Sequence, residues 1–389
     1  MRIKMKIKPS VNLAAKFAAS FLISSVLCTI SLNGQAVRNS GTGNITSVPA
    51  KSSKPADNSQ MPLYGNWQNF TSQNGLPSDK TYAVRIIGDS VLVGTHEGMA
   101  VYNKGKWHIY TTKDGLAHNG VVAIDYSKTS GDIWIGTLSG LSRWSGGKFE
   151  NFNQFNSGLP NDLVYSVYCD DNDVWVATGG GAGLYHTFTK EWEIFTEQNA
   201  PMHEPWTYGI SVGNGKAFIA AWGGGVIEYD LKTKHFRDYT DPDGFMEIDL
   251  LPDDGPVHDI TTGTSYSNGL LWISSYFGLS RYDGKNWKGY FDHDSGLASN
   301  FINNIRAVGP VAYMCTDKGL STFNSETWIT YKRDANGTAG TAIITKGKEV
   351  KEIRQNPSIS HSFIVNVDAV GDDVWVATSK GVSHGVRQK

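Results

Sequence analysis

Cysteine is scarce, charged residues are few, and neither sign of charge is in clear excess. The 389 residues include three cysteines, and no CxxCH motif occurs, which excludes attached c-type haem. Only 19% of residues are charged, and 35 basic against 37 acidic side chains give a formal net charge of -2. Since nucleic-acid binding requires a basic surface to neutralise phosphates, this balance opposes such a role.

What the sequence does contain indicates a large folded core. Hydrophobic residues make up 40% of the chain, and there are 43 glycines and 12 tryptophans. A chain this apolar and aromatic is not disordered throughout. Abundant glycine and tryptophan with few charges favours an all-β protein over a helical bundle.

The first 36 residues predict an export signal. Arg2 and four lysines precede an uncharged segment that runs from residue 17 to residue 36, and no acid occurs in this stretch. Gly34 and Ala36 provide the small residues that a signal peptidase requires, so we expect cleavage after Ala36 and a periplasmic or extracellular protein. Without this stretch, 30 basic side chains face 37 acidic ones.

Two alternatives to cleavage stay open at this end of the chain. The uncharged stretch is long enough for an uncleaved membrane anchor. Cys28 is a less favoured lipid attachment site, because Leu27 stands where lipoproteins usually have a small residue. Residues 37–62 are rich in Ser, Asn, Pro and Lys and predict a flexible linker before a folded body at 63–389.

The folded body repeats one pattern seven times. An aromatic-x-x-aromatic motif begins at residues 67, 107, 149, 192, 236, 287 and 328, about every 42 residues. Between these motifs run segments such as IWIGT (133–137) and VWVAT (174–178), each followed by a segment such as GLSRW (140–144). Each segment has the length and composition of a β-strand, and dipeptides such as Asn214-Gly215 mark turns between strands.

Four strands in about 42 residues, repeated seven times, predict a seven-bladed β-propeller with four antiparallel strands per blade. The tryptophan of the VWVAT-type strand is expected to pack between blades, where its burial contributes roughly 2–3 kcal/mol. The last blade lacks an outer strand, and YGNWQNF (64–70) precedes the first blade. We therefore expect this N-terminal strand to complete the last blade and close the ring.

The repeat also places the two cysteines that follow the export signal. Cys169 falls in the third blade and Cys315 in the sixth, on opposite sides of a ring. Their Cα atoms are then too far apart for a disulfide, so we expect two buried, inert thiols.

Four phrases carry a resemblance to a known family. NGLPSDKTYAV (74–84), DGLAHNGVVAI (114–124), SGLPNDLVYSV (157–167) and SGLASNFINNI (295–305) each precede a strand of the IWIGT type. This pattern resembles the two-component regulator propeller repeat, which builds the periplasmic ligand-sensing part of many hybrid histidine kinases. The resemblance spans residues 64–389, although blades 4, 5 and 7 lack the GLxxN phrase. No kinase follows, so the resemblance implies only the sensing or binding half of that role.

The connections that emerge on one face of the propeller are unusually long on one side of the ring. Those at 196–207, 240–259 and 332–362 join an outer strand to the next inner strand and are expected to be expanded loops. The turns between second and third strands of blades 3 to 5 carry Gly179–Ala182, Trp222–Gly225 and Tyr276-Phe277. A rigid scaffold that presents variable loops is where binding residues usually lie.

These loops predict a binding site on that face, called here the loop face. Its expected lining comprises Trp206, Tyr208, Trp222, Tyr276 and Phe277, with polar contacts from His203, Glu204, Asp249, Asp254, His258 and His293. Aromatic residues alternating with acids suit a carbohydrate, a peptide or a small cationic ligand. The alternative is that the long loops only cap the channel and pack their own aromatic side chains.

Motifs for catalysis or metal binding are weak. Gly209–Gly213 matches G-x-S-x-G but lies in a predicted strand, where the serine of that motif does not function. The aspartates of the 241–259 loop and those near Asp292 miss calcium-loop positions, which leaves only a non-standard calcium site open. His203-Glu204 lacks the second histidine of HExxH, and a zinc site from His203, His258, His293 and His361 would need four separate loops.

The sequence favours an exported, monomeric, non-catalytic binding module, with a small-molecule, glycan or peptide ligand or a cell-envelope protein as partner. No cofactor is firmly implied, and calcium or another divalent metal is an open alternative. A metal-dependent lyase or hydrolase on the same face is the second hypothesis, because seven-bladed streptogramin lyases look like this architecture. A scaffold subunit of a cell-envelope complex is the third. Fold alone does not decide among them.

Overall fold

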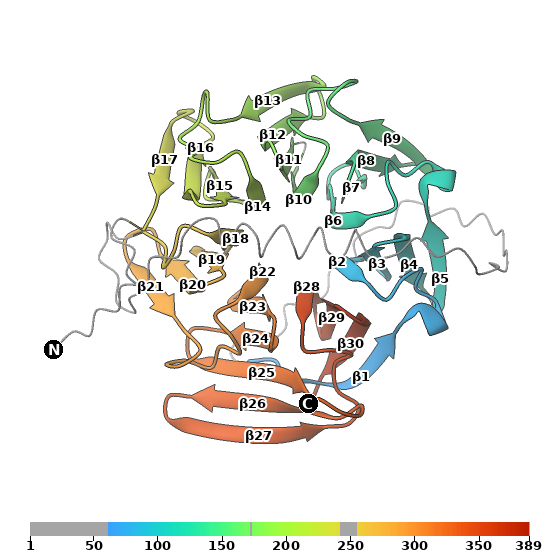
Figure 1. Cartoon of the computed structure of the whole chain (residues 1–389), viewed down its shortest axis with the longest axis vertical. Helices are drawn as coiled ribbons and strands as arrows, with labels where there is room; N and C mark the ends of the chain where they lie inside the picture. Colours follow the sequence, from blue (N-terminus) through green and yellow to red (C-terminus); the bar gives the residue numbers. More distant parts are fainter. Residues whose placement is uncertain (1–60, 172, 242–254, 389) are drawn as a thin grey trace.

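In the computed structural model, seven β-sheets stand around a central axis like the blades of a propeller (Figure 1). The structure describes residues 61–171, 173–241 and 255–388. Besides strands, these residues form two short 3-10 helices, η1 (Ser72–Asn74) and η2 (Thr112–Asp114). None of the described helices has the length and apolar character needed to cross a membrane.

Each blade runs from an inner strand at the axis to an outer strand at the rim. Blade 1 comprises β2 (Thr81–Ile87), β3 (Ser90–Thr95), β4 (Gly98–Asn103) and β5 (Lys106–Tyr110). Blade 2 comprises β6 (Val121–Tyr126), β7 (Ile133–Thr137), β8 (Gly140–Ser145) and β9 (Lys148–Phe152). Blade 3 comprises β10 (Val164–Asp170), β11 (Asp173–Thr178), β12 (Gly181–His186) and β13 (Glu191–Phe195).

The remaining blades continue this order around the ring. Blade 4 comprises β14 (Thr207–Gly213), β15 (Lys216–Ala221), β16 (Gly225–Asp230) and β17 (Phe236–Tyr239). Blade 5 comprises β18 (Thr261–Ser267), β19 (Leu270–Ser275), β20 (Gly278–Tyr282) and β21 (Trp287–Tyr290). Blade 6 begins with β22 (Ile302–Val308), β23 (Val311–Thr316), β24 (Gly319–Phe323) and β25 (Thr327–Arg333). Blade 7 comprises β28 (Ile364–Val370), β29 (Asp373–Thr378), β30 (Gly381–Arg387) and β1 (Tyr64–Phe70).

The core lies between the blades, as the repeat predicted. The tryptophans of the second strands are almost fully buried: Trp134, Trp175, Trp272 and Trp375. Trp134 of blade 2, for example, shares a cluster with Leu159 and Val164, which belong to the approach to blade 3 and to its inner strand. The recurring tryptophan therefore joins neighbouring blades.

The N-terminal strand closes the ring. β1 pairs antiparallel with β30, so that Phe70 lies opposite Val382 and Tyr64 opposite Arg387. The Phe70 ring stacks on Trp375 of β29, with centroids 5.4 Å apart and planes 12° apart. The prediction that residues 64–70 complete the last blade is confirmed.

Blade 6 differs from the prediction, because its sheet has six strands. Residues 332–362 were expected to form a loop, but β26 (Gly340–Lys346) and β27 (Glu349–Gln355) form a hairpin that extends the sheet beyond β25. The segment is rich in the β-branched residues Thr and Ile, which favour strands. Gly347 sits in the tight turn with φ 58°. Blade 6 thus projects past the rim (Figure 1).

A repeated hydroxyl shapes the turns between second and third strands on the loop face. In six blades a Thr or Ser hydroxyl at the end of the second strand donates to the carbonyl of the glycine three residues later, at 2.6–2.9 Å. Blade 4 is the exception, since Ala221 occupies this position.

A second repeated device closes the connections that lead into the inner strands. In six blades, the side chain of the residue three positions before the inner strand accepts a hydrogen bond. The donor is the backbone N–H two residues later, and the accepting residues are Ser78, His118, Asn161, His258, Ser299 and His361. In the same six blades, the side chain of the following residue accepts a hydrogen bond from a backbone N–H at the start of the connection. These residues are Asp79, Asn119, Asp162, Asp259, Asn300 and Ser362. The end of the GLxxN phrase therefore closes a turn, and blade 4 again differs, with Glu204 and Pro205 there.

Candidate functional site

The loop face is most irregular at blade 4, which lacks both turn devices. Ala221 replaces the hydroxyl residue, Pro205 replaces the turn-closing side chain, and Trp206 and Trp222 follow them directly. Blade 4 keeps the backbone hydrogen bond that other blades have at this level, here from the Trp222 N–H to the Trp206 carbonyl, and adds a bridge between Trp222 and Ile260. Departures from a repeat's own rules are expected where the chain performs a function.

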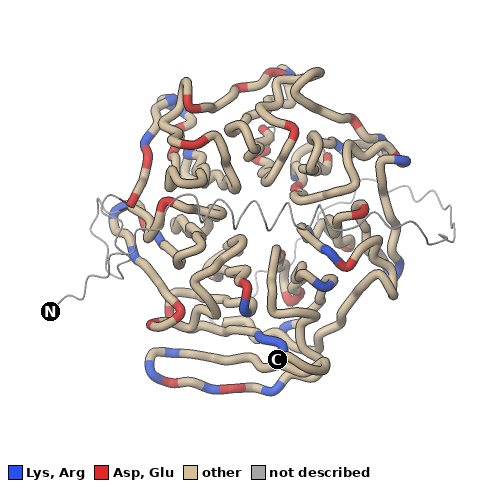
Figure 2. Tube along the Cα trace, in the orientation of Figure 1, with Lys and Arg blue, Asp and Glu red and all other residues tan. Residues whose placement is uncertain are grey.

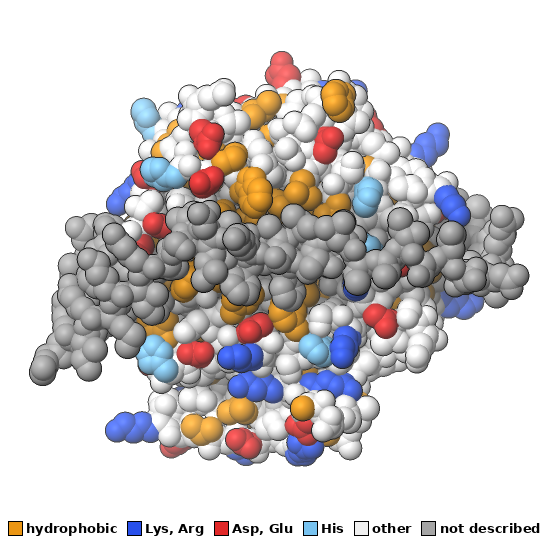
Figure 3. Space-filling view, viewed as in Figure 1, with side chains coloured by type: hydrophobic (Ala, Val, Ile, Leu, Met, Phe, Trp, Pro, Cys, Tyr) orange, Lys and Arg blue, Asp and Glu red, His pale blue; other side chains and the backbone are white. Residues whose placement is uncertain are grey.

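Aromatic rings follow the loop face from blade 3 to blade 6 as one contiguous series, called here the aromatic arc. It consists of Tyr165, Tyr208, Trp222, Tyr276 and Phe301. Neighbouring ring centroids are 3.9–5.6 Å apart, and the Tyr276 and Phe301 planes are 6° apart. Such contacts fix the rings in place. Figure 3 shows hydrophobic side chains gathered around the centre of this face.

The arc contains three of the predicted aromatic residues: Tyr208, Trp222 and Tyr276. Trp222 is buried, with 6% of its surface exposed, so it supports the arc and offers little surface for a ligand. Burial raises the pKa of Tyr208, whose hydroxyl interacts with that of Tyr165, so both phenols are neutral at physiological pH. The fourth aromatic residue, Phe277, packs beside this cluster.

His258 has a structural role in its turn. Its Nδ1 accepts the Ile260 N–H at 3.0 Å, and its ring stacks on Phe277 with centroids 3.9 Å apart and planes 15° apart. Burial lowers the pKa of His258 to about 4. The imidazole is therefore neutral at physiological pH and carries its proton on Nε2, since Nδ1 is the acceptor.

The predicted residues of the 196–207 connection are exposed. Trp206 is 37% exposed, and His203 and Glu204 are also exposed beside the glycine turn of blade 4. An exposed tryptophan on a firmly held turn is suited to stacking against a ligand. Asp249 and Asp254, and with them most of the suggested calcium loop, lie outside the described residues.

His293 lies in the connection between blades 5 and 6. Its side chain is 69% exposed and stays 3.9 Å from both Asp292 and Asp294. In the part of the chain that the structure describes, no group of three or more His, Cys, Asp and Glu residues is arranged to hold a metal ion. The described residues of the loop face thus give no geometric support to a shared zinc site.

Two further expectations from the sequence are met. Ser211 of the G-x-S-x-G match is buried in strand β14, and its hydroxyl bonds to Thr264 at 3.1 Å, so it is no exposed nucleophile. Cys169 and Cys315 are unpaired thiols in blades 3 and 6, and Cys315 is buried as expected, whereas Cys169 is only half-buried. Burial raises the pKa of both thiols, which keeps them protonated and unreactive.

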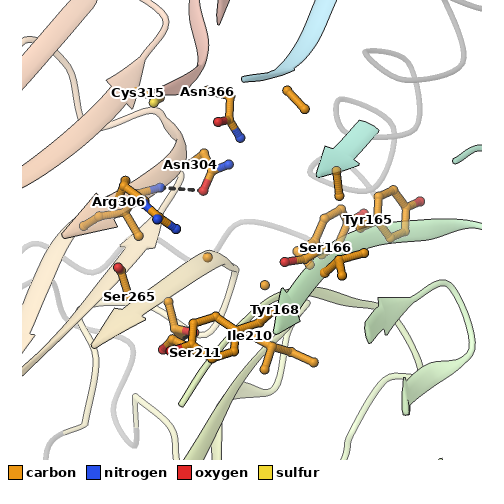
Figure 4. A pocket seen from close by; sticks show the side chains of 18 of the residues that line it. Tyr165, Ser166, Tyr168, Ile210, Ser211, Ser265, Asn304, Arg306, Cys315 and Asn366 are labelled. Carbon is orange, nitrogen blue, oxygen red and sulfur yellow. Dashed lines mark hydrogen bonds between the residues drawn. The ribbon is translucent and has the colours of Figure 1, made fainter. Parts of the chain in front are cut away.

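The central channel contains a cavity of about 100 Å³, shown in Figure 4. All seven inner strands line it, and each has a β-bulge between its first and third residues. Bulges re-aim the neighbouring side chains. Tyr165 and Tyr208 of the aromatic arc belong to this lining, so the arc and the cavity adjoin.

The fifth residue of each inner strand has a polar side chain that contacts the next blade, all the way around the ring. This inner belt consists of Arg85, Asp125, Tyr168, Ser211, Ser265, Arg306 and Asp368. Arg85 lies 2.6 Å from Asp125, and Arg306 lies 3.3 Å from Asp368. Asp368 also accepts the Ile86 N–H at 2.9 Å, which carries the series from blade 7 back to blade 1.

The other contacts of the inner belt follow the same pattern. Asp125 accepts the Cys169 N–H at 2.8 Å, and the Tyr168 hydroxyl donates to the Val212 carbonyl at 3.1 Å. Ser265 accepts the Ala307 N–H at 2.8 Å. Each interface between inner strands is therefore bridged by a side chain of the belt.

Burial and charge act against each other within the belt. Burial alone would lower the pKa of Arg85, but the charges of Asp125 and Asp368 outweigh it and raise that pKa. Burial raises the pKa of Asp368, and Arg85 and two backbone N–H groups offset part of this increase.

Of the residues that line the cavity, the sequence predicted only Tyr208 as a site residue. Tyr165, Asn304, Arg306 and Asn366 lie within strands, where the repeat suggested only structural roles, and Phe301 of the aromatic arc was not predicted either. One signal was available. The third residue of the inner strand is Ala, Ser or Gly in blades 1 to 5 but Asn in blades 6 and 7.

Comparison with solved structures identifies similar folds. The extracellular domain of the hybrid two-component system BT3049 from B. thetaiotaomicron superimposes with a TM-score of 0.61 at 16% identity, over 83% of this chain and 42% of that one. The extracellular domain of the one-component system BT4673 from the same organism gives 0.51 at 20% identity, over 81% and 46%. This chain shares its β-propeller fold with these two extracellular domains.

The same fold also occurs in an enzyme. Virginiamycin B lyase from Staphylococcus aureus gives a TM-score of 0.59 at 14% identity, over 83% of this chain and 98% of that one. The chain thus spans less than half of each extracellular domain but nearly all of the lyase. No family model and no curated protein matches the sequence. At these identities the likeness shows the fold alone, and the site must support any function.

Proposed function

We propose that this protein is an exported, non-catalytic binding module whose loop face, around blades 3 to 6, holds a small-molecule, glycan or peptide ligand. The observation that carries this proposal is the departure of blade 4 from the turn rules that the other six blades keep. Ala221 and Pro205 give up two structural hydrogen bonds, and Trp206 is left 37% exposed beside the aromatic arc.

The arrangement is suited to binding. The arc packs its rings against one another, so a ligand at its exposed edges meets a wall that is already ordered and has little entropy left to lose. Trp206 supplies an exposed ring, and His203 and Glu204 supply polar groups on the same connection. Aromatic surface with a few polar groups is typical of small-molecule sites.

The described residues favour binding over catalysis. His258 uses Nδ1 to close its turn and stacks on Phe277 beside the arc, and its low pKa disfavours a role as general base near neutral pH. The similar sensor domains are extracellular parts of signalling proteins, which supports an exported location and a sensing role for this chain as well.

A binding screen with two matched variants tests the proposal. The purified protein, Trp206→Ala and Phe188→Ala are exposed to an array of neutral and acidic oligosaccharides and to a set of tripeptides. Phe188 is 83% exposed in the turn between β12 and β13, on the opposite face. Loss of an exposed aromatic anchor costs about 1–2 kcal/mol, so Trp206→Ala should bind about tenfold more weakly, and Phe188→Ala should bind like the parent protein.

The proposal fails if no probe binds, or if both variants bind like the parent protein. Equal loss in both variants would point to a general effect on folding, which thermal unfolding of each variant detects. Turnover of a bound probe would establish the enzyme hypothesis in place of a non-catalytic module.

A further inference from the structure

The lining of the central cavity is rich in hydrogen-bond donors that lack partners. Asn304 uses its Oδ1 to accept the Ile305 N–H at 2.7 Å, which leaves its NH₂ group for the channel (Figure 4). Asn366 and Ser166 also line the cavity, and their side chains make no hydrogen bond with the described residues. Three blades thus direct neutral polar groups toward one small space.

The charged side chains that line the cavity are all positive. Arg85 and Arg306 line the cavity, whereas no Asp or Glu among the described residues does so. Asp125 and Asp368 contact the two guanidinium groups from within the inner belt. The Nε atoms of both arginines are buried, and that of Arg306 lies 3.3 Å from Asp368. Among the described residues, Arg306 contacts a carboxylate only through this Nε, which leaves its terminal nitrogens as donors for an acceptor-rich occupant.

The two asparagines are departures from the repeat. Neighbouring inner strands approach closely at this level, so that a Cβ atom on Gly209 would lie 2.7 Å from the Cα of Gly263. Blades 1 to 5 accordingly carry Ala, Ser or Gly at the third position. Blades 6 and 7 place Asn304 and Asn366 there, on the same side as Arg306.

We infer that the central cavity binds a carboxylate group of the ligand. The Arg306 fork and the amides of Asn304 and Asn366 are the donors that hold it, because a planar guanidinium matches a carboxylate and the amides satisfy its remaining lone pairs. The cavity, at about 100 Å³, holds several water-sized groups but is below the roughly 300 Å³ of a site that encloses a whole ligand.

This inference rests on the proposed function and specifies its ligand class. The carboxylate occupies the channel, and the remainder of the molecule extends past Tyr165 and Tyr208 onto the aromatic arc, because these two rings line both. A sugar acid and the C-terminus of a short peptide both provide this chemistry.

Calorimetry with paired probes tests the inference. Glucuronate is compared with glucose, and N-acetylalanine with N-acetylalanine amide, so that each pair differs in the carboxylate and the two pairs represent the two sources. At least one acid should bind, and its neutral counterpart should bind about tenfold to a hundredfold more weakly, as expected when a hydrogen-bonded charge is lost.

Variants then assign the effect to the cavity. Asn366→Asp places a negative charge beside the carboxylate and should weaken binding of the acid by at least about tenfold. Asn214→Asp makes the same change in an exposed turn on the opposite face and should leave the affinity unchanged. Asn366→Ser is expected to fold, since blade 3 carries Ser166 at this position, and should weaken the binding several-fold through the shorter donor.

Three results would overturn the inference. They are the absence of binding by both acids, equal binding of an acid and its neutral counterpart, and equal affinity of Asn366→Asp and Asn214→Asp. A neutral oligosaccharide whose binding depends on Trp206 but not on Asn366 would reject the carboxylate site and leave the loop-face binding module standing.

Discussion

At the scale of the residue, one turn position is served by different side chains in different blades. Ser78, His118, Asn161, His258 and Ser299 each accept the backbone N–H two residues later. What the turn requires is a short side chain with an acceptor atom. A histidine at this turn position is therefore explained by its turn unless some other feature singles it out.

His258 should make folding sensitive to acid. Its pKa is about 4 in the folded protein and about 6.5 in an unfolded chain. The unfolded state therefore binds more protons between these values, and stability is lost as the pH falls from about 6.5 toward 4. We expect the parent protein to lose about 1–2 kcal/mol more than His258→Asn between pH 7 and pH 5, measured by urea unfolding at each pH.

Asparagine is the appropriate replacement because Asn161 closes the equivalent turn of blade 3 at 2.9 Å. The variant should consequently fold and bind like the parent protein at pH 7. Parallel stability curves for the two proteins across this pH range would show that the His258 pKa is not depressed.

At the scale of the element, the inner strands depend on the inner belt. Backbone hydrogen bonds join the strands within each blade, but neighbouring inner strands belong to different sheets. Only side chains can join them near the axis, and Asp368 alone contacts Arg85, Arg306 and the Ile86 N–H. The belt links the seven sheets at their narrowest point.

Removal of Asp368 should be far more damaging than removal of a neutral belt residue. Asp368→Ala leaves Arg85 and Arg306 with less compensation in a buried site and should cost about 3–5 kcal/mol. Ser211→Ala removes a neutral hydrogen bond and should cost about 1 kcal/mol. Denaturant unfolding measures both values, and similar costs for the two variants would mean that the charges of the belt contribute no special stability.

The added hairpin presents an edge that is unsuited to uncontrolled pairing. β27 is the last strand of its sheet, and Glu349, Lys351, Glu352 and Arg354 alternate in charge along it (Figure 2). Charged side chains on an edge strand disfavour pairing with other chains. At its other end, Gln355 is buried and accepts a hydrogen bond from the Trp67 indole at 2.9 Å, so the hairpin also secures the closing strand.

At the scale of the whole molecule, ring closure depends on a strand that lies more than 300 residues from its partner. β1 contributes Tyr64, Trp67 and Phe70, which are all buried. The Tyr64 hydroxyl bonds to that of Tyr313 at 2.8 Å, and the Tyr64 N–H donates to the Tyr331 hydroxyl at 2.9 Å. β1 therefore contacts blade 6 as well as completing blade 7.

Deletion of residues 61–70 should open the ring. β30 would become an exposed apolar edge, and the truncated chain should self-associate and lose its single cooperative unfolding transition. A synthetic peptide of residues 61–74, added in trans, should restore a monomer. Light scattering and thermal unfolding measure both effects, and a truncated chain that stays monomeric with unchanged thermal stability would contradict this account.

The sequence determined the architecture because the signal for it is local and repeated. Strands β1 and β7 coincide with the predicted segments 64–70 and 133–137, and the tryptophans pack between blades as expected. The hairpin of blade 6 was missed, because a single unrepeated excursion has no other copy with which to compare it.

The candidate site depended on distances that no local pattern contains. The sequence indicated Tyr208, Trp222 and Tyr276, but only the fold stacks them with Tyr165 and Phe301 into one arc. Residues of different blades meet at the axis although 40 or more positions separate them, so neither the inner belt nor the cavity could be deduced from spacing. The periodic sequence fixes how each blade folds, and closure of the ring decides which side chains converge, because convergence follows from the arrangement of the sheets around one axis.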